Sequence, residues 1–511
     1  MRCLALAQAW QDAGGNVVFA MAASTFAIDA RLRSEGMEIV QLTVPPNSVR
    51  DARDVSALAR HCQANWVVVD GYQFDSDYQH AIKGTGLKLL WVDDLGQCKS
   101  YFADLILNQN PHAQGGMYGN REPFTRLLLG TRYTLLRREF KPWRLWNREA
   151  SPAARKILVT MGGSDPENIT ARVLEAFSLI DMAGLEARLV VAGSNPHIDF
   201  LRKICGRVSA NVRLLIDPAN IPELMAWADV AISAAGTTCW EICLLGLPAI
   251  LIHVAENQLP VACQLARMQA AIHLGAAKEV SAWQIASQLQ SLLIAAELRM
   301  RLSQNARAFV DGRGAERVVS AMRSSMLRLR RVEEKDCQLL WDLANDPGVR
   351  ASSFSPEQIS WTRHQTWFER KLNDPNCMIL IAENEASRAV GQFRVDETSP
   401  RAGEIDVSLA PEARGLGLGA SLIELGVRSV FASTGIECLH AFVKPENRAS
   451  MLAFARAEFV RTGDEEVDGR FVAHFVRTRD PQERGAPHVS QGDADAIAGA
   501  EDRGEHCVSA D

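Results

Sequence analysis

The sequence lacks long apolar runs, paired cysteines and zinc-ligand clusters. No apolar run reaches the roughly 18 residues that a bilayer-spanning helix needs, and the apolar run in residues 1–7 is too short for a convincing signal peptide. The 11 cysteines contain no C-x-x-C pair. Scattered, unpaired cysteines fit a reducing compartment. We therefore expect a cytoplasmic protein without an integral membrane segment or a bound metal.

A strong excess of charge is also missing. The 511 residues carry a net charge of −6, with a pI near 6.1. This balance provides no broad basic field for nucleic acid or an anionic membrane. The length corresponds to about three domains of ordinary size. The oligomeric state cannot be predicted from the sequence.

The first half alternates short apolar runs with helical stretches, which is typical of parallel sheets covered by helices. A break with two prolines and two tryptophans at residues 141–154 separates two such alternations. We predict two Rossmann-like domains, residues 1–145 and 146–328, that face each other across a cleft. A helical stretch at 297–330 closes the second. The expected strands are 16–21, 66–70, 87–93, 105–107, 156–161, 187–192, 212–216, 230–233 and 249–253.

Beyond residue 328 the pattern changes to a mixed α+β domain, residues 329–478. Residues 378–383 and 389–395 predict a hairpin, and further strands are expected at 404–409, 437–443 and 470–476. The end of the chain, 479–511, is rich in Gly, Ala and acids and lacks aromatic residues. That composition predicts a disordered acidic tail.

The strongest nucleotide signal in the first half is an ordered set within residues 229–258. A strand runs into a small-residue turn around Gly236, and a helix follows. Such a turn lets a phosphate approach free backbone N–H groups at the helix start. Thr237 and Thr238 can add hydroxyl donors, and Glu241 can accept from ribose hydroxyls. Each piece alone is also explained by an ordinary capped helix, and only the ordered set favours a nucleotide.

Six segments together resemble the UDP-sugar hydrolases of pseudaminic acid biosynthesis, relatives of the MurG-type glycosyltransferases with the GT-B fold. The resemblance covers about residues 1–325. The segments are Arg2-Cys3-Leu4-Ala5-Leu6-Ala7, Val69-Asp70-Gly71-Tyr72, Val92-Asp93-Asp94, Met161-Gly162-Gly163-Ser164-Asp165, Gly236-Thr237-Thr238-Cys239-Trp240-Glu241 and Glu256-Asn257-Gln258.

The resemblance implies that water attacks the anomeric carbon of UDP-2,4-diacetamido-2,4,6-trideoxy-β-L-altropyranose and that UDP leaves, without a metal. Tyr72, Asp94 and Asn257 would contact the sugar or orient water, although for Tyr72 and Asp94 a loop hydrogen bond is an equal alternative. The implied UDP-sugar contacts are Arg2, Gly162, Ser164, Gly236, Thr237, Thr238, Glu241, Asn257 and Gln258.

The start of the chain departs from this family, which begins with a strand and a G-x-G-H-x-x-R segment whose His is the expected catalytic residue. Here Met1-Arg2-Cys3 aligns with the end of that segment, so Arg2 is what remains of it. Either the start codon is assigned too far downstream, or this form is catalytically impaired. His253 ends an expected strand near the site, where a structural role is at least as well supported.

The clearest motif in the chain is Arg414-Gly415-Leu416-Gly417-Leu418-Gly419, set between an alternating strand and an apolar-periodic helix at 421–431. Three glycines at alternate positions expose consecutive backbone N–H groups, which form a nest for a pyrophosphate. This segment resembles motif A of the GNAT acetyltransferases, over about residues 330–478. The residues then implied to bind acetyl-CoA are Leu409, Arg414, Gly415, Leu416, Gly417, Leu418, Gly419, Ala420 and Asn447.

The acid and base of the acetyltransferase stay open. Many GNAT proteins carry a Tyr where this chain has Phe454, and their Gly-Phe is Glu458-Phe459 here. Glu404 and Asp406 alternate on one strand face and are the candidate bases, with a surface role as an equal alternative. In the segment 341–350, which resembles the acceptor-binding start of sugar-amine acetyltransferases, Arg350 is a weaker acceptor-site candidate, as is His364 further along.

Together the two resemblances predict a bifunctional enzyme that N-acetylates a UDP-linked 4-amino sugar and then releases the diacetylated sugar from UDP. Two alternatives remain: a GT-B glycosyltransferase fused to an acetyltransferase, or a first half that only binds UDP-sugar. The expected partners are a UDP-amino-sugar and acetyl-CoA, with no nucleic acid.

Overall fold

The computed structural model describes residues 1–149, 151–163, 165–208, 211–384, 386–467 and 470–479. They form two compact units, Met1–Met322 and the residues from Arg323 onward. Ser164 and most of the expected tail, 480–511, lie outside the described residues. The expected domain 1–145 falls in the first unit, and the expected domain 146–328 falls in it as far as Met322. The boundary between the two at 145/146 stays a prediction.

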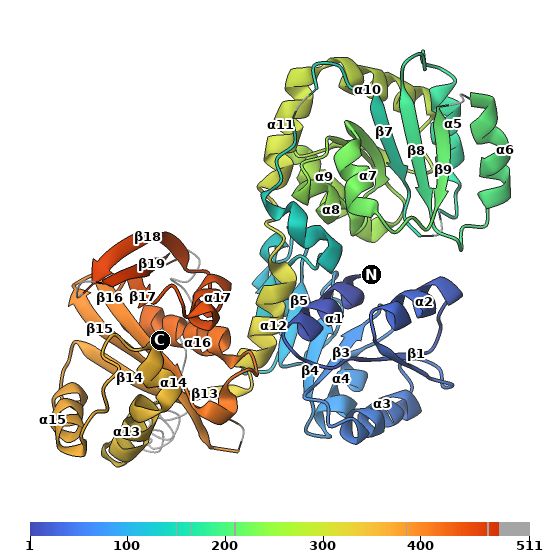
Figure 1. Ribbon diagram of the computed structural model, residues 1–511. Coiled ribbons are helices and arrows are strands. Elements are labelled where there is room, and N and C mark those ends of the chain that lie inside the picture. The colour runs from blue at the N-terminus through green and yellow to red at the C-terminus, as the bar shows by residue number, and fades with distance from the viewer. Residues whose placement is uncertain (150, 164, 209–210, 385, 468–469, 480–511) are drawn as a thin grey trace, which may run out of the picture. The chain divides into compact units, whose positions relative to one another are not determined.

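The N-terminal part of the first unit contains only parallel strands (Figure 1). β1 (Val18–Met21) pairs with β2 (Glu38–Gln41), and a separate sheet has the order β3-β4-β5-β6. Its strands are β3 (Trp66–Asp70), β4 (Lys88–Val92), β5 (Leu105–Asn108) and β6 (Arg126–Leu129). The helices are α1 (Arg2–Asp12), α2 (Phe26–Ser34), α3 (Val49–His61) and α4 (Ser76–Lys83).

Three of these helices begin at residues with short polar side chains. The side chains of Thr25, Ser48 and Asp75 accept hydrogen bonds from backbone N–H groups in the first turns of α2, α3 and α4. Those N–H groups have no partner within their own helices, so the caps fix where the helices start.

The second part of the unit is one six-stranded parallel sheet, in the order β12-β11-β10-β7-β8-β9. Numbered from its first strand, this is the doubly wound order 3-2-1-4-5-6, in which ligands bind at the switch point between strands 1 and 4. Here those strands are β7 and β10. The strands are β7 (Lys156–Thr160), β8 (Glu186–Val191), β9 (Val212–Ile216), β10 (Val230–Ala234), β11 (Ala249–His253) and β12 (Ile272–Ala276).

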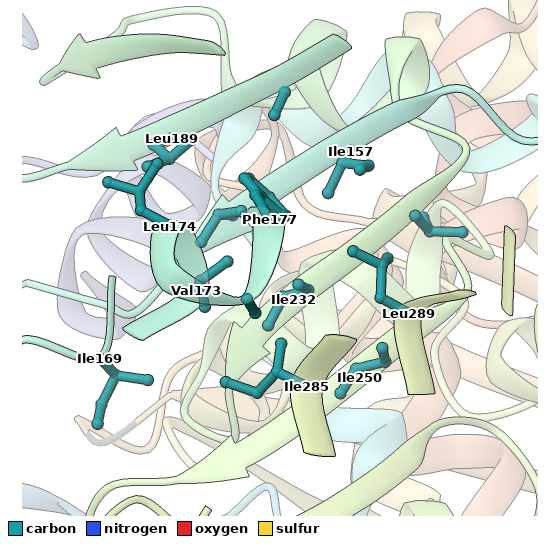
Figure 2. Close-up of a cluster of buried hydrophobic side chains, with 14 of the residues drawn as sticks. Ile157, Ile169, Val173, Leu174, Phe177, Leu189, Ile232, Ile250, Ile285 and Leu289 are labelled. Carbon is teal, nitrogen blue, oxygen red and sulfur yellow. The ribbon is translucent and has the colours of Figure 1, made fainter. Parts of the chain in front are cut away.

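Helices cover both faces of this sheet. α5 (Ile169–Phe177), α6 (Ile198–Val208) and α10 (Ala282–Ile294) pack on one face, and Figure 2 shows part of the apolar core that they share with the strands. α7 (Ile221–Trp227), α8 (Thr238–Leu244) and α9 (Leu259–Arg267) cover the other face. Cys239 and Cys243 of α8 are buried in that second core.

The prediction of one helical stretch over residues 297–330 is wrong in part. α11 (Ala296–Arg307) and α12 (Gly314–Ser324) are separate helices, because Gly312 between them has a φ of +76° that no helix contains. The last residues are a strand, β13 (Leu327–Arg331), which pairs antiparallel with β14 (Cys377–Asn384). Its alternating Leu and Arg side chains suit a strand with one buried face.

The second unit contains a mixed seven-stranded sheet, in the order β13-β14-β15-β16-β17-β19-β18. The expected hairpin is confirmed as β14 and β15, and all pairs are antiparallel except β16 with β17. The strands are β14 (Cys377–Asn384), β15 (Ala389–Ser399), β16 (Ala402–Leu409), β17 (Cys438–Val443), β18 (Val460–Val467) and β19 (Arg470–Thr478). The helices are α13 (Cys337–Asn345), α14 (Pro347–Ser352), α15 (Trp361–Leu372), α16 (Leu418–Ser433) and α17 (Arg448–Arg456).

The predicted fold class, parallel α/β sheets followed by a mixed α+β domain, is confirmed. Among the described residues, no helix combines the length and apolar character that a bilayer crossing requires.

Candidate nucleotide and acyl-donor sites

A cavity of about 360 Å³ lies at the switch point of the six-stranded sheet. Its volume is within the range of small-molecule sites. The turns that follow β7 and β10 form one wall, and residues from the N-terminal part of the unit form the other. The lining residues are Arg2, Tyr72, Asp94, Gln109, Asn110, Met161, Gly162, Gly163, Asp165, Pro166, Ala234, Ala235, Gly236, Thr237, Thr238, Trp240, Val254, Asn257, Gln258 and Val261.

The buried carboxylate of Asp165 joins the turn after β7 to the start of α5. Asp165 accepts backbone hydrogen bonds from Ile169 (2.8 Å) and Thr170 (2.9 Å), so it caps α5. Gly162 has a φ of +81°, a conformation that favours glycine. Residues 161–163, 165 and 166 of this segment line the cavity.

The turn after β10 also presents small residues. Gly236, Thr237 and Thr238 line the cavity, and a Cβ added at Gly236 would lie 3.5 Å from the Gln258 side-chain nitrogen. Gln258 in turn accepts from the backbone N–H of Val254 at 3.0 Å. Because α8 has only seven residues, its N-terminus alone does not define an anion site. The facing turn and the opposite wall complete the site.

A hydrogen-bond network builds the opposite wall. The Arg2 guanidinium donates a fork to Asp70 (3.0 and 2.7 Å) and a second pair of bonds to Asp94 (both 2.8 Å). Tyr72 donates to Asp94 at 2.7 Å and accepts from the Asn257 amide at 2.7 Å. Tyr72 and Asn257 come from the two parts of the first unit, so this bond crosses the cavity.

Hydrogen bonds occupy all the acceptor positions of the Asp94 carboxylate. Its two oxygens accept twice from Arg2, once from Tyr72 and once from Asn110, which fills the roughly four lone-pair positions of a carboxylate. Burial and the hydrogen bond to Asp94 raise the pKa of Tyr72 to about 12. Tyr72 is therefore a neutral phenol at physiological pH, and Asp94 orients it.

The Arg2 guanidinium pairs with two carboxylates, Asp70 and Asp94, of which Asp94 lines the cavity. Although burial disfavours an ionised carboxylate, the hydrogen bonds from Arg2 hold the pKa of Asp70 below its usual value. The charged side chains that line the cavity are therefore Arg2 and Asp94 on this side and Asp165 on the side of the two turns, where Thr237 and Thr238 add hydroxyls.

Glu241 is not among the cavity-lining residues. Its carboxylate accepts from Arg137 at 2.8 Å, and Arg137 also pairs with Glu139 at 2.9 Å. Burial raises the pKa of Glu241, and Arg137 opposes that rise. Arg137 was not among the predicted site residues, because 104 positions separate it from Glu241 and no local motif marks it.

His253 lies outside the cavity lining as well. Its ring Nδ1 is 2.9 Å from Nε2 of His273 on the neighbouring strand. Burial, together with His253, lowers the pKa of His273. These contacts are consistent with a structural role for His253, which the sequence analysis considered at least as well supported as a role in the site.

In the second unit, side chains anchor the glycine-rich turn between β16 and α16. Arg414 donates to the Leu409 carbonyl (3.0 Å) and to Asp346 (2.5 Å), which also caps α14. Gly415 and Gly417 have φ values of +74° and +70°. The turn therefore has the left-handed conformation that aims successive N–H groups outward, with Leu418, Gly419 and Ala420 at the start of α16.

Strands β16 and β17 separate beyond their first residues. Their parallel pairing ends at Glu404 and His440, whereas β16 stays paired with β15 as far as Leu409. The far end of β16 therefore has backbone groups on its β17 side that no described strand pairs with. Asp406 accepts from Gln392 at 2.7 Å, and burial raises the pKa of Glu404.

The other residues of this unit that the sequence analysis discussed make hydrogen bonds or packing contacts within the fold. Asn447 accepts from the Ser450 N–H (3.1 Å) and caps α17. Phe454 packs against Phe459 and Phe475 in the core. Glu458, at the usual Gly position, has a φ of +65°. His364 is buried against the Cys337 carbonyl (3.0 Å), and Arg350 donates to the carbonyls of Ala344, Ser355 and Glu357.

Within the described ranges, no three His, Cys, Asp or Glu side chains gather in a group that could hold a metal. The predicted absence of a metal stays a prediction.

Two family domains match the chain. Residues 157–320 match the glycosyltransferase family 28 C-terminal domain, and residues 326–460 match the acetyltransferase (GNAT) domain. The chain joins a glycosyltransferase-28-like domain to a GNAT domain. The GNAT match supports an enzyme.

Two relatives and two solved structures are similar to the chain. An uncharacterized protein of Methanocaldococcus jannaschii is 22% identical over 479 residues, 90% of this chain and 93% of that protein. The spore coat polysaccharide biosynthesis protein SpsG of Bacillus subtilis is 25% identical over 245 residues, 47% of this chain and 70% of that protein. The structure of the spermidine N-acetyltransferase of Vibrio cholerae with CoA and spermine is 21% identical to the chain. The match covers 30% of this chain and 96% of that one (TM-score 0.28). The structure of the aminoglycoside acetyltransferase AAC(6')-Ib with coenzyme A is 19% identical to the chain, and the match covers 31% of this chain and 96% of that one (TM-score 0.28).

Proposed function

We propose that the chain is a bifunctional, cytoplasmic, metal-independent enzyme of nonulosonic (pseudaminic) acid biosynthesis. The second unit N-acetylates the 4-amino group of a UDP-linked amino sugar with acetyl-CoA. The first unit hydrolyses UDP-2,4-diacetamido-2,4,6-trideoxy-β-L-altropyranose to free sugar and UDP.

The observation that carries the hydrolase proposal is that the two turns of the switch point and the Arg2–Tyr72–Asp94 network line one cavity. The turns at Gly162 and Gly236–Thr238 bring amides and hydroxyls to one side, and the Asp94 carboxylate lies on the other. Cleavage of a glycosyl–phosphate bond develops positive charge on the sugar and negative charge on the leaving diphosphate. We assign the donors of the turns to the diphosphate and the Asp94 carboxylate to the side of the sugar.

In this reaction the oxygen of water forms a bond to the anomeric carbon while the bond from that carbon to the diphosphate oxygen breaks. UDP leaves with the electron pair, and the proton that the attacking water loses passes to solvent or to the oxygen of the departing diphosphate. Tyr72, fixed by Asp94 and Asn257, retains one lone pair for a hydrogen bond to water or to a sugar hydroxyl. Asp94 acts as an orienting residue, because its oxygens have no capacity left for a proton from water.

Glu241 has a supporting role in the same proposal. Arg137 holds one carboxylate oxygen, and we assign the ribose hydroxyls to the other. The relative named for spore coat polysaccharide biosynthesis matches 47% of the chain, which supports chemistry on a sugar.

The acetyltransferase proposal rests on the GNAT match together with the turn at Gly415–Gly419 and the separation of β16 from β17. The turn suits the pyrophosphate of acetyl-CoA, and the unpaired edge of β16 suits the amides of its pantetheine arm. Glu404 or Asp406 then accepts the proton of the acceptor amine. The product of this unit is the substrate of the other, which a covalent link keeps at raised local concentration.

The hydrolase is tested by incubating the full chain with the UDP-linked diacetamido sugar, without any acceptor, and measuring UDP release. We expect release by the chain and by the exposed control Asn147→Ala, and a loss of about 100-fold in Asn257→Ala. Release only in the presence of a second sugar or lipid would establish a glycosyltransferase instead. UDP binding without turnover would establish a binding protein.

The acetyltransferase is tested by following the CoA thiol released from acetyl-CoA with a UDP-linked 4-amino sugar and, separately, with spermidine. The proposal expects transfer to the amino sugar. Transfer to spermidine but not to the sugar would overturn it.

A further inference from the structure

A chain of polar side chains crosses three strands of the second unit, outside the residues considered above. Cys438 Sγ lies 3.4 Å from His440 Nε2, and His440 Nδ1 lies 2.9 Å from His474 Nε2. His474 Nδ1 lies 2.6 Å from a Glu465 oxygen and 3.0 Å from the Thr462 hydroxyl. The two imidazole planes differ by only 15°, so a proton moves between the rings almost within one plane.

The carboxylate at one end fixes the tautomers of both rings. An ionised Glu465 only accepts, so His474 Nδ1 must carry a proton and its Nε2 must be an acceptor. His440 Nδ1 then carries the proton between the rings, and His440 Nε2 has a lone pair that faces Cys438 Sγ at 3.4 Å. The chain therefore has a basic nitrogen at its inner end and a carboxylate at its outer end.

The inner end lies where β16 and β17 separate. His440 is the register partner of Glu404 in the last pair of these parallel strands, and lateral neighbours in a sheet point to the same face. Gly391 and Phe393 of β15 contact α16 on the other face. Glu404, Asp406, His440 and Phe442 thus share the face away from α16.

The outer end reaches solvent. The His474 side chain is 12% exposed and that of Glu465 is 52% exposed. Burial and the neighbouring His474 lower the pKa of His440, and Glu465 opposes that effect. The titratable and charged groups on the elements around His440 are Glu404 and Asp406 of β16, with Arg350 of α14 near Asp406, Cys438 of β17, Glu465 of β18 and His474 of β19.

We propose that His440, His474 and Glu465 form a proton relay that takes the proton of the acceptor amine from Glu404 and delivers it to solvent. The inference rests on the proposed acetyl transfer. An ammonium group loses two protons as its nitrogen bonds to the acetyl carbon and the thioester C–S bond breaks. One proton ends on the sulfur of coenzyme A, and the other leaves through Glu404, His440, His474 and Glu465 in turn.

The same chain argues against an acetylated cysteine. Burial raises the pKa of Cys438, so its sulfur stays a neutral thiol and a poor nucleophile. In the relay it only donates to His440 and holds that ring in place. His440, His474 and Glu465 act through Glu404 and are positioning residues rather than catalytic ones.

Acetyl-transfer kinetics across pH separate a relay from a purely structural cluster. In His440→Gln we expect kcat to fall about 100-fold, with the KM for acetyl-CoA unchanged. In Glu465→Gln the loss of negative charge lowers the pKa of His440, so the acid limb of kcat/KM moves down by about one pH unit. Glu466→Gln, the next exposed carboxylate on β18, is the matched control and keeps the wild-type profile. A wild-type kcat in His440→Gln, or identical profiles for the two glutamine variants, would overturn the relay.

Nitrogen NMR of the full chain, labelled with ¹⁵N-histidine, tests the relay without any acceptor. Both rings should be Nδ1–H tautomers when neutral, and Glu465→Gln should lower the pKa of His440. Nε2–H tautomers would refute the relay even if acetyl transfer occurs. If the predicted tautomers are found but no amino sugar is acetylated, the proposed function fails and the relay does not.

Discussion

Replacing Arg137 by methionine tests the buried ion pair beneath the nucleotide cavity. Arg137 and Glu241 are 10% and 14% exposed at their side chains and 2.8 Å apart. Methionine fills similar space but leaves the Glu241 carboxylate without its partner. Breaking a buried pair in this way costs about 3–5 kcal/mol, so we expect a loss of that order at pH 8.

The loss should depend on pH in a definite direction. Burial raises the pKa of Glu241 above its ordinary value of 4.5, and without Arg137 the folded-state pKa rises further. A carboxyl group with a raised folded-state pKa destabilises the fold progressively as pH rises from its unfolded pKa through its folded one. The defect of Arg137→Met is therefore small near pH 4.5 and complete above the folded pKa.

The assay is thermal unfolding of the full chain at pH 5 and pH 8, with Glu241→Gln and the double variant as controls. The double variant carries no buried charge, so it should recover most of the stability at pH 8 and lose the pH dependence. Equal destabilisation of Arg137→Met at both pH values would refute the reasoning, because a packing defect does not titrate.

Three further substitutions have defined outcomes. In Gly417→Ala the added Cβ would clash with the Arg323 guanidinium, and residue 417 would keep a φ of +70° that side chains disfavour. Calorimetry should show that the affinity for CoA falls about tenfold and that the affinity for UDP does not change. Tyr72→Phe should slow UDP release about 100-fold while UDP still binds within about twofold in calorimetry, and equal losses of both would contradict an orienting role. Asp346→Ala removes the cap of α14 and the partner of Arg414, so the melting temperature should fall by the equivalent of about 1 kcal/mol and CoA should bind more weakly.

Local patterns were sufficient for much of the fold. β3 has the bounds that its apolar run predicts, and the glycine motif at 415–419 lies between a strand and a helix as expected. In both cases the information is contained in consecutive residues. β13 was expected to be helical because its strand character depends on pairing with β14, which begins 46 residues after β13 ends (377 minus 331).

The site was less predictable, because its side chains find partners far along the chain. Arg2 and Asp94 are 92 positions apart, and Tyr72 and Asn257 are 185 apart. The sequence pointed to these residues through a family resemblance but contained no sign of how they pair. The saturation of Asp94, and the separation of β16 from β17, follow only from the three-dimensional arrangement.

The central claim is that one chain holds two independent diphosphate sites, one for UDP and one for coenzyme A. Calorimetric titration of the full chain with UDP and with CoA, each alone and in the presence of the other, tests it most directly. We predict one site for each ligand, with affinities that the other ligand leaves unchanged. Competition between the two ligands, or binding of neither, would contradict the account.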